Sequence, residues 1–159
     1  MKALTMLALV LLITINANPA IGQGKGKQTA NIIGTFESAE RADKKIALIR
    51  YLPSNSGKFG LLLQDDGKQG LDFGTDVDGL RQFNEYLDKA IRVPATSAQE
   101  PVGNVDSFTD IGVAVYASNT EDVIVSFVNI NTNMATDVHI SKLRARDLQK
   151  QIFTIIVKQ

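Results

Sequence analysis

The sequence of 159 residues contains no cysteine and a single histidine, His139. Without cysteine, the chain forms no disulfide bond and offers no thiolate ligand for a metal. A chain of this length buries about two thirds of the surface that it exposes when unfolded, so it needs no covalent or metal staple. We therefore expect one ordinary hydrophobic core.

Several patterns that carry enzyme chemistry are also missing. No Gly-x-Ser-x-Gly, Gly-x-Gly-x-x-Gly or phosphate-loop pattern occurs. His139 has only Asp137 near it in the sequence, so a metal or acid–base site would need groups from distant segments. Asp65 and Asp66 are adjacent on an expected turn, where their side chains diverge. We therefore expect a protein that is not an enzyme, with no catalytic residue, no metal and no cofactor.

The segment Gly74–Glu85 partly matches a calcium-binding loop. Asp76, Asp78, Gly79 and Glu85 occupy the third, fifth, sixth and twelfth positions of that pattern. The first position requires an acid and holds a glycine instead. The same residues also form the start of an amphipathic helix, and a calcium loop is not helical there. We therefore favour the helix over the metal site.

The chain has no net charge, because 17 basic residues balance 17 acidic ones. A neutral protein lacks the basic field that is typical of a nucleic-acid-binding protein. The charge is uneven, however, and such local excesses usually lie on solvated faces. Near the C-terminus only Asp147 opposes the basic residues Lys142, Arg144, Arg146, Lys150 and Lys158.

The N-terminus has the pattern of a secretory signal peptide. A short basic start, Met1–Lys2, precedes the uncharged, apolar run Ala3–Ile15 and the polar stretch Asn16–Gly22, which contains small residues. The apolar run is too short to span ~30 Å of hydrocarbon at ~1.5 Å per residue. We expect a periplasmic or secreted protein whose mature chain begins at Gln23 and has no transmembrane segment. Loss of Lys2 leaves 16 basic and 17 acidic residues, a net charge of −1.

The most regular structural pattern is Ile111–Ile130, in which two β-branched, apolar runs flank the polar break Ser118–Asp122. A hairpin with this break as its loop has one bulky, apolar face, which we expect to look into the core. On that face the predicted register pairs Ala117 with Val123, Val115 with Val125, and Val113 with Phe127.

The other face of this hairpin is smaller and less apolar. It carries Gly112, Ala114 and Ser126 around Tyr116. A shallow surface of small residues beside an aromatic ring can admit a partner's backbone or a flat ligand. We therefore predict these four residues as a binding surface. The alternative is that they only allow the other half of the chain to pack closely.

Around this hairpin the sequence predicts four strands and a helix, twice. The expected strands are 31–38, 44–52, 58–64 and 69–74 before a helix at 75–92, then 105–108, 110–117, 123–130 and 135–140 before a helix from 142 to about 154. Thr75 begins a capping-box-like start, and Ser141 is the expected N-cap of the second helix. The prediction is therefore an α+β fold of antiparallel sheet with two helices.

The expected domain organisation follows from this order. After the signal peptide at 1–22 and a flexible arm at 23–30, residues 31–159 form a single domain. Its half-repeats are 31–92 and 103–159, joined by a linker at 93–102, and Leu80 matches Leu143 between them.

The ββββα–ββββα order is similar to that of the Whirly single-stranded-DNA-binding proteins. The similarity covers most of the mature chain and lies in the order of elements, so it carries over no functional residue. It implies binding of single strands, which uses cations and stacking aromatics. The residues that would supply them are Lys44, Lys45, Arg50, Tyr51, Lys58 and Phe59.

The same residues have an alternative interpretation as a solvated sheet face with lysines along its edge. Because the chain is nearly neutral and carries a signal peptide, nucleic acid is the less favoured partner. The leading hypothesis is a secreted or periplasmic, non-enzymatic binding module for an unknown protein or small ligand. A Whirly-like protein is the second hypothesis, and an enzyme of unrecognised type is the third.

Overall fold

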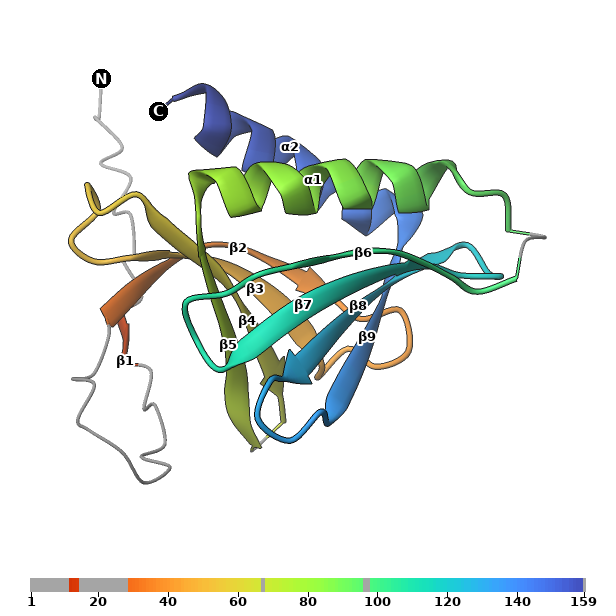
Figure 1. Cartoon of the computed structure of the whole chain (residues 1–159), viewed down its shortest axis with the longest axis horizontal. Coiled ribbons are helices and arrows are strands. Elements are labelled where there is room, and N and C mark those ends of the chain that lie inside the picture. The colour runs from red at the N-terminus through yellow and green to blue at the C-terminus, as the bar shows by residue number, and fades with distance from the viewer. Residues whose placement is uncertain (1–11, 15–28, 67, 96–97, 159) are drawn as a thin grey trace, which may run out of the picture.

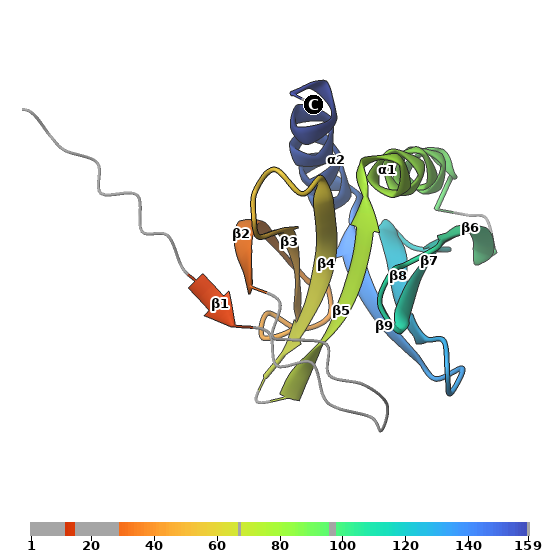
Figure 2. The same cartoon turned by 60° about the vertical axis from the view of Figure 1, so that its left-hand side comes forward.

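The structure is a computed structural model that describes residues 12–14, 29–66, 68–95 and 98–158. Two antiparallel sheets lie beneath two helices that pack against each other (Figures 1 and 2). The first sheet contains β1 (Leu12–Thr14), β2 (Thr29–Glu37), β3 (Lys45–Tyr51), β4 (Lys58–Asp65) and β5 (Lys68–Asp76), and α1 (Val77–Arg92) follows it. The second contains β6 (Glu100–Val105), β7 (Ile111–Ala117), β8 (Asp122–Asn129) and β9 (Ala135–Ser141), followed by α2 (Lys142–Val157). The predicted α+β class and ββββα–ββββα arrangement are confirmed.

The strand β1 lies within the predicted signal peptide. It pairs antiparallel with the start of β2, with Leu12 opposite Asn31 and Thr14 opposite Thr29. The rest of the predicted signal peptide, and residues 23–28 of the predicted arm, lie outside the described residues. No helix among the described residues is long and apolar enough to cross a membrane.

The predicted register of the hairpin β7–β8 is confirmed. Val115 lies opposite Val125, and Val113 lies opposite Phe127. These four side chains are buried, and they join one core that is formed by both sheets and both helices. The alternation of bulky and small residues therefore placed each face of the hairpin correctly.

The structure corrects the predicted linker and the strand after it. β6 begins at Glu100, inside the expected linker, and ends at Val105, so that residues 106–108 of the expected strand 105–108 lie in a loop. Its edge position in the sheet and the bulge between Pro101 and Gly103 explain the error. Proline and glycine are tolerated at edges and bulges, where they give a strand the composition of a linker.

The ends of the helices also differ from the prediction. Asp76, not Thr75, caps α1, because its carboxylate accepts a 2.9 Å hydrogen bond from the Gly79 amide. α2 continues to Val157 instead of ending near Thr154. Ile155 lies on the buried side of this last turn, so packing overrides the preference of β-branched residues for strands.

The two helices bury the same pattern of positions. The five residues that α1 buries each have a counterpart 65 positions later on α2: Leu80, Phe83, Leu87, Ala90 and Ile91 correspond to Ala145, Leu148, Ile152, Ile155 and the half-buried Ile156. The predicted match of Leu80 with Leu143 is wrong, because Leu143 lies on the exposed side of α2.

α1 packs mainly on the second sheet, and α2 packs on strands of both sheets. α1 lies on β6 and β7, where the Tyr86 ring covers Gly103, and α2 lies on β2, where the Gln151 side chain covers Gly34. Gly34 in β2 and Gly103 in β6 each follow a bulge. An added Cβ atom would meet the end of the Gln151 side chain at Gly34 and the Tyr86 ring at Gly103. Contacts of the helices with both sheets and with each other therefore join the halves around one core.

Loops also cross between the halves and close two sheet edges. The amide of Phe108, in the loop between β6 and β7, donates a 2.9 Å hydrogen bond to the carbonyl of Gly74 on β5. The amide of Ala39, in the loop between β2 and β3, donates a 2.7 Å hydrogen bond to the carbonyl of His139 on β9. Each bond thus satisfies one backbone carbonyl that the edge strand would otherwise leave unpaired.

Candidate functional site

A hollow of about 440 Å³ lies on the outer face of the second sheet, on the side away from the shared core. Three of the four predicted binding residues line it, namely Gly112, Ala114 and Tyr116 from β7. The other lining residues come from β6, β7, the end of β8 and the loops beside them: Pro101, Gly103, Asn104, Val105, Asp106, Val113, Val128, Ile130 and Asn133.

The hollow exists because the residues at its base, Gly112 and Ala114, have small side chains. A Cβ atom added to Gly112 would meet no atom closer than Cγ1 of Ile130, at 3.8 Å, so the space above this residue is open. Ala114 beside it is half-buried, and so is the Tyr116 side chain. The floor is therefore apolar and shallow, with one aromatic residue beside it.

Ser126, the fourth predicted residue, does not line the hollow. It lies on β8 between Ala114 and Asp137 in the register, and only 2% of its surface is exposed. The sequence also missed Pro101, which was assigned to the linker, and Asn104, which preceded the expected strand at 105–108. The proline and glycine of β6 gave no periodic signal that could have placed them beside β7.

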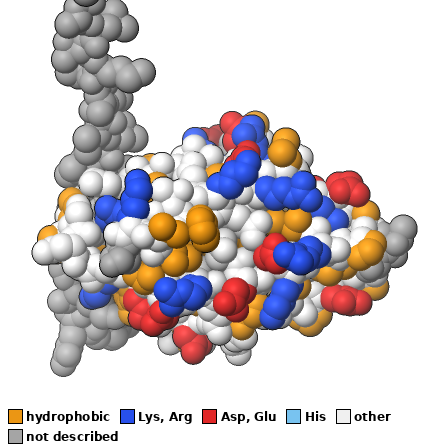
Figure 3. Space-filling model, turned by 90° about the horizontal axis from the view of Figure 1, so that it is seen from above, with side chains coloured by type: hydrophobic (Ala, Val, Ile, Leu, Met, Phe, Trp, Pro, Cys, Tyr) orange, Lys and Arg blue, Asp and Glu red, His pale blue; other side chains and the backbone are white. Residues whose placement is uncertain are grey.

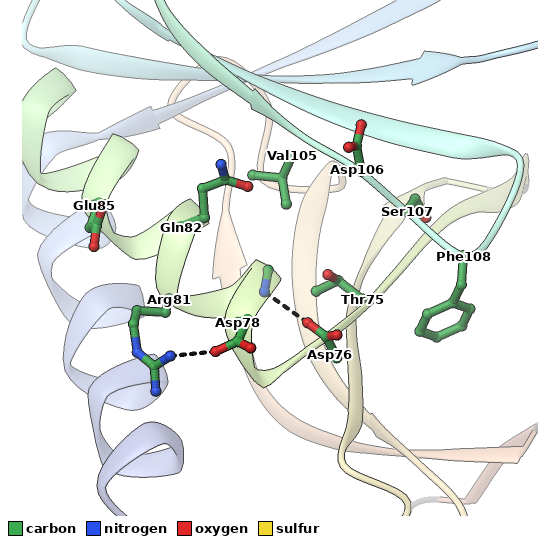
Figure 4. A pocket seen from close by; sticks show the side chains of 11 residues that line it. Thr75, Asp76, Asp78, Arg81, Gln82, Glu85, Val105, Asp106, Ser107 and Phe108 are labelled. Atoms are coloured by element: carbon green, nitrogen blue, oxygen red, sulfur yellow. Dashed lines mark hydrogen bonds and ion pairs between the residues drawn. The ribbon is translucent and has the colours of Figure 1, made fainter.

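A second hollow, of about 620 Å³, lies at the N-terminus of α1 (Figure 4). Its lining includes four acids and one base, but several of these groups already have partners. Asp76 caps the helix, and Arg81 forms an ion pair with Asp78. Figure 4 shows Glu85 and Asp106 well apart, on the helix and on the loop after β6. The chain is helical from Val77, which confirms the helix that the sequence favoured over a calcium loop.

His139 lies between two acids on the edge of the second sheet. Its Nε2 is 3.5 Å from a carboxylate oxygen of Glu40, and its Nδ1 is 4.0 Å from one of Asp122. Neither of the two hollows includes this histidine. Among the described residues, no group of three or more His, Cys, Asp and Glu side chains is placed to hold a metal ion. The loop after β2 meets β9 here, where the Ala39 amide also donates to the carbonyl of His139.

A polar pair, with Tyr51 buried and Asp72 half-buried, lies on the outer face of the first sheet. The Tyr51 hydroxyl donates a hydrogen bond to the Asp72 carboxylate. Burial raises the pKa of Asp72 above its usual range, against the opposing effect of this hydrogen bond. Burial, with the negative charge of Asp72, also raises the pKa of Tyr51. The Phe108 ring packs edge-on against Tyr51 with 5.5 Å between centroids, so the pair lies beneath the loop that closes β5.

The residues proposed for nucleic-acid binding do not form an open stacking surface. Tyr51 and Phe59 are 1% and 0% exposed. Stacking on a base requires an exposed ring face, which these two residues do not offer. The Lys44 ammonium donates a 2.6 Å hydrogen bond to the carbonyl of Asp137, and the Arg50 guanidinium lies 5.3 Å from the centroid of the Phe59 ring. Lys45 is half-buried, and the ammonium of Lys58 lies over the Phe108 ring.

Comparison with known proteins gives no relative on which to base a function. No protein-family model matches the chain, and no curated protein or solved structure matches it. Any functional assignment therefore depends on the geometry of the chain's own surfaces.

Proposed function

We propose that the protein is an exported, non-enzymatic binding module, and that the hollow over β6 and β7 binds a small, flat, largely apolar ligand. The observation that carries the proposal is the hollow itself. Its volume of about 440 Å³ falls in the range of ~300–1,000 Å³ that is typical of ligand sites. Its floor of Gly112 and Ala114 lets a planar group approach the sheet closely.

The polar groups around the hollow indicate the chemistry of the ligand. Asp106 is the one charged residue in the described lining, and Asn104 and Asn133 add two amides. A few polar groups around an apolar floor are what fixes the orientation of a ligand in such sites. A carboxylate attracts a positive charge or a hydrogen-bond donor and repels an anion. We therefore expect a planar amine to bind and a planar acid of the same shape not to bind.

Export is supported by the N-terminal pattern alone. The basic start, the apolar run and the small residues before Gln23 occur in the order that a signal peptidase recognises. The absence of cysteine from the sequence is compatible with an oxidising compartment, which permits disulfides without requiring them.

The ligand proposal is tested with two probes that differ in charge, 1-naphthylmethylamine and 1-naphthoic acid. Binding is measured by saturation-transfer NMR on the exported protein and on the variant Ala114→Arg. We expect the amine to give a signal that the acid does not give. The arginine side chain of Ala114→Arg would occupy the floor of the hollow, and its positive charge would repel the amine, so the variant should give no binding signal. Because the substitution is at the surface, it should leave the melting temperature unchanged.

Ala42→Arg provides the matched control, since Ala42 is exposed in the loop between β2 and β3. It should leave both binding and melting unchanged. Retention of the amine signal in a folded Ala114→Arg protein would refute the site. Should Ala114→Arg unfold the protein, Gly112→Ala takes its place, because its added methyl group meets only ordinary contacts in the folded chain. A Gly112→Ala protein that binds the amine with unchanged affinity would then contradict the proposal.

A further inference from the structure

The outward side of α2 carries a stripe of exposed residues that combines apolar and basic side chains. Along the helix, spaced by three or four residues, these are Leu143, Arg146, Lys150, Phe153 and Val157. Three or four positions bring helical side chains onto one face. The three apolar members are 68%, 61% and 65% exposed, in chain order, although large apolar residues are usually covered. We call this set the α2 stripe.

The core fixes the orientation of the stripe. Ala145, Leu148 and Ile152 bury the opposite side of the helix completely. The stripe therefore points away from the sheets, on the side of the molecule where the helices lie. Figure 3 looks down on this side, and it shows apolar side chains interspersed with lysine and arginine. From Leu143 to Val157 the stripe extends about 21 Å at ~1.5 Å per residue.

The two neighbouring helices differ in charge. Residues 142–158, which include α2, carry five basic residues and one acid, whereas α1 carries three of each. The positive charge of the helical side is thus concentrated around the α2 stripe. Only Lys150, among the basic residues of the stripe, has an ion-pair partner within the described residues, the exposed Asp147 at 3.6 Å. Exposed pairs of this kind contribute little energy, so the charge remains available to a partner.

We propose that the α2 stripe binds the protein to an anionic lipid surface. Basic side chains are attracted to anionic headgroups, while Leu, Phe and Val side chains enter the boundary between headgroups and acyl chains. Because the other side of α2 belongs to the core, the helix docks flat with its three apolar side chains immersed. The protein attaches as a whole and reversibly, since three side chains provide far less apolar area than an isolated amphipathic helix.

Two other occupants fit the stripe less well. A second copy in a symmetric dimer would bring Arg146 and Lys150 close to their own counterparts, and like charges repel there. A nucleic acid would use the basic residues and stack on Phe153, but it offers no apolar phase for Leu143 and Val157. An anionic bilayer satisfies both components of the stripe.

The test is co-sedimentation of the exported protein with vesicles of phosphatidylglycerol and phosphatidylcholine, against vesicles of phosphatidylcholine alone. We expect binding to the anionic vesicles, and we expect salt to weaken it. The double variant Arg146→Gln/Lys150→Gln should lower the partition coefficient about 25-fold, since ~1 kcal/mol for each basic side chain corresponds to about fivefold. Phe153→Ser/Val157→Ser should lower it at least tenfold without changing the melting temperature.

Matched variants separate the stripe from general effects of charge and apolarity. Arg81→Gln/Lys89→Gln removes the same charge from α1, and Met134→Ser removes an exposed apolar side chain from the loop between β8 and β9. Both should bind vesicles as the parent does. The N-terminus of every preparation is checked by mass, and all variants share it, so only differences between variants are interpreted.

Three outcomes would overturn the proposal. The first is no binding to anionic vesicles at low salt. The second is an equal loss of binding in the α1 double variant, which would mean that net charge alone is responsible. The third is a dimer in light scattering that Phe153→Ser/Val157→Ser dissociates, which would assign the stripe to a second copy.

Discussion

Gly103 offers a direct test of the packing between α1 and the second sheet. A Cβ atom at this position would lie 2.5 Å from Cζ of Tyr86, and 2.6 and 2.7 Å from Cε1 and Cε2. Contacts under about 3.4 Å between carbon atoms are strongly repulsive, so the ring or the strand must move. We therefore expect Gly103→Ala to destabilise the protein, although alanine usually suits a strand better than glycine.

The size of this effect follows from two opposing terms. Overpacking by one methyl group costs about 1–3 kcal/mol. Alanine also lowers the conformational entropy of the unfolded chain, which stabilises the folded state by about 0.4–1 kcal/mol. We expect Gly103→Ala to lower the free energy of unfolding by about 1–2 kcal/mol. When Tyr86→Ala has removed the ring, the same change should cost nothing or stabilise the protein, which gives a coupling of about 1–3 kcal/mol.

Urea denaturation of the four proteins of this double-mutant cycle, followed by far-ultraviolet circular dichroism, measures the coupling. Gly112→Ala is the control, because its new Cβ would meet no atom within 3.8 Å and should be neutral or slightly stabilising. If Gly103→Ala costs the same with and without the Tyr86 ring, the ring is not the cause, and α1 does not lie on β6 as described.

Two further predictions concern a half-buried carboxyl group and the N-terminus. Folding raises the pKa of Asp72 above its usual 3.8, so ionisation of Asp72 destabilises the folded state; this penalty is absent below the unfolded pKa and is complete above the folded one. Asp72→Asn should therefore stabilise the protein relative to the parent more at about pH 7 than at about pH 3, and an equal difference at both pH values in urea titrations would refute it. The exported protein should begin at Gln23, and a mass that corresponds to a chain beginning at Met1 would contradict the signal peptide.

Local periodicity accounts for the parts of the fold that the sequence predicted. The β7–β8 register follows from the alternation between large and small side chains. Because successive side chains in a strand point to opposite faces, the size of each side chain indicates the face on which it lies. The buried stripe of α1 follows in the same way from apolar residues three and four positions apart. Gly112, Ala114 and Tyr116 were placed on one face by this rule, and the hollow over β7 contains all three.

The remaining features depend on contacts between residues far apart in the chain, which no local pattern encodes. β6 has a linker's composition and becomes a strand because β7 pairs with it and α1 covers it. Phe59 was a plausible stacking residue until the packing of the first sheet against the helices buried it. The sequence by itself thus determined the order of elements and the faces of the best-patterned ones. Only the tertiary structure decided which faces are covered, because a face is buried by helices and strands that are distant in the sequence.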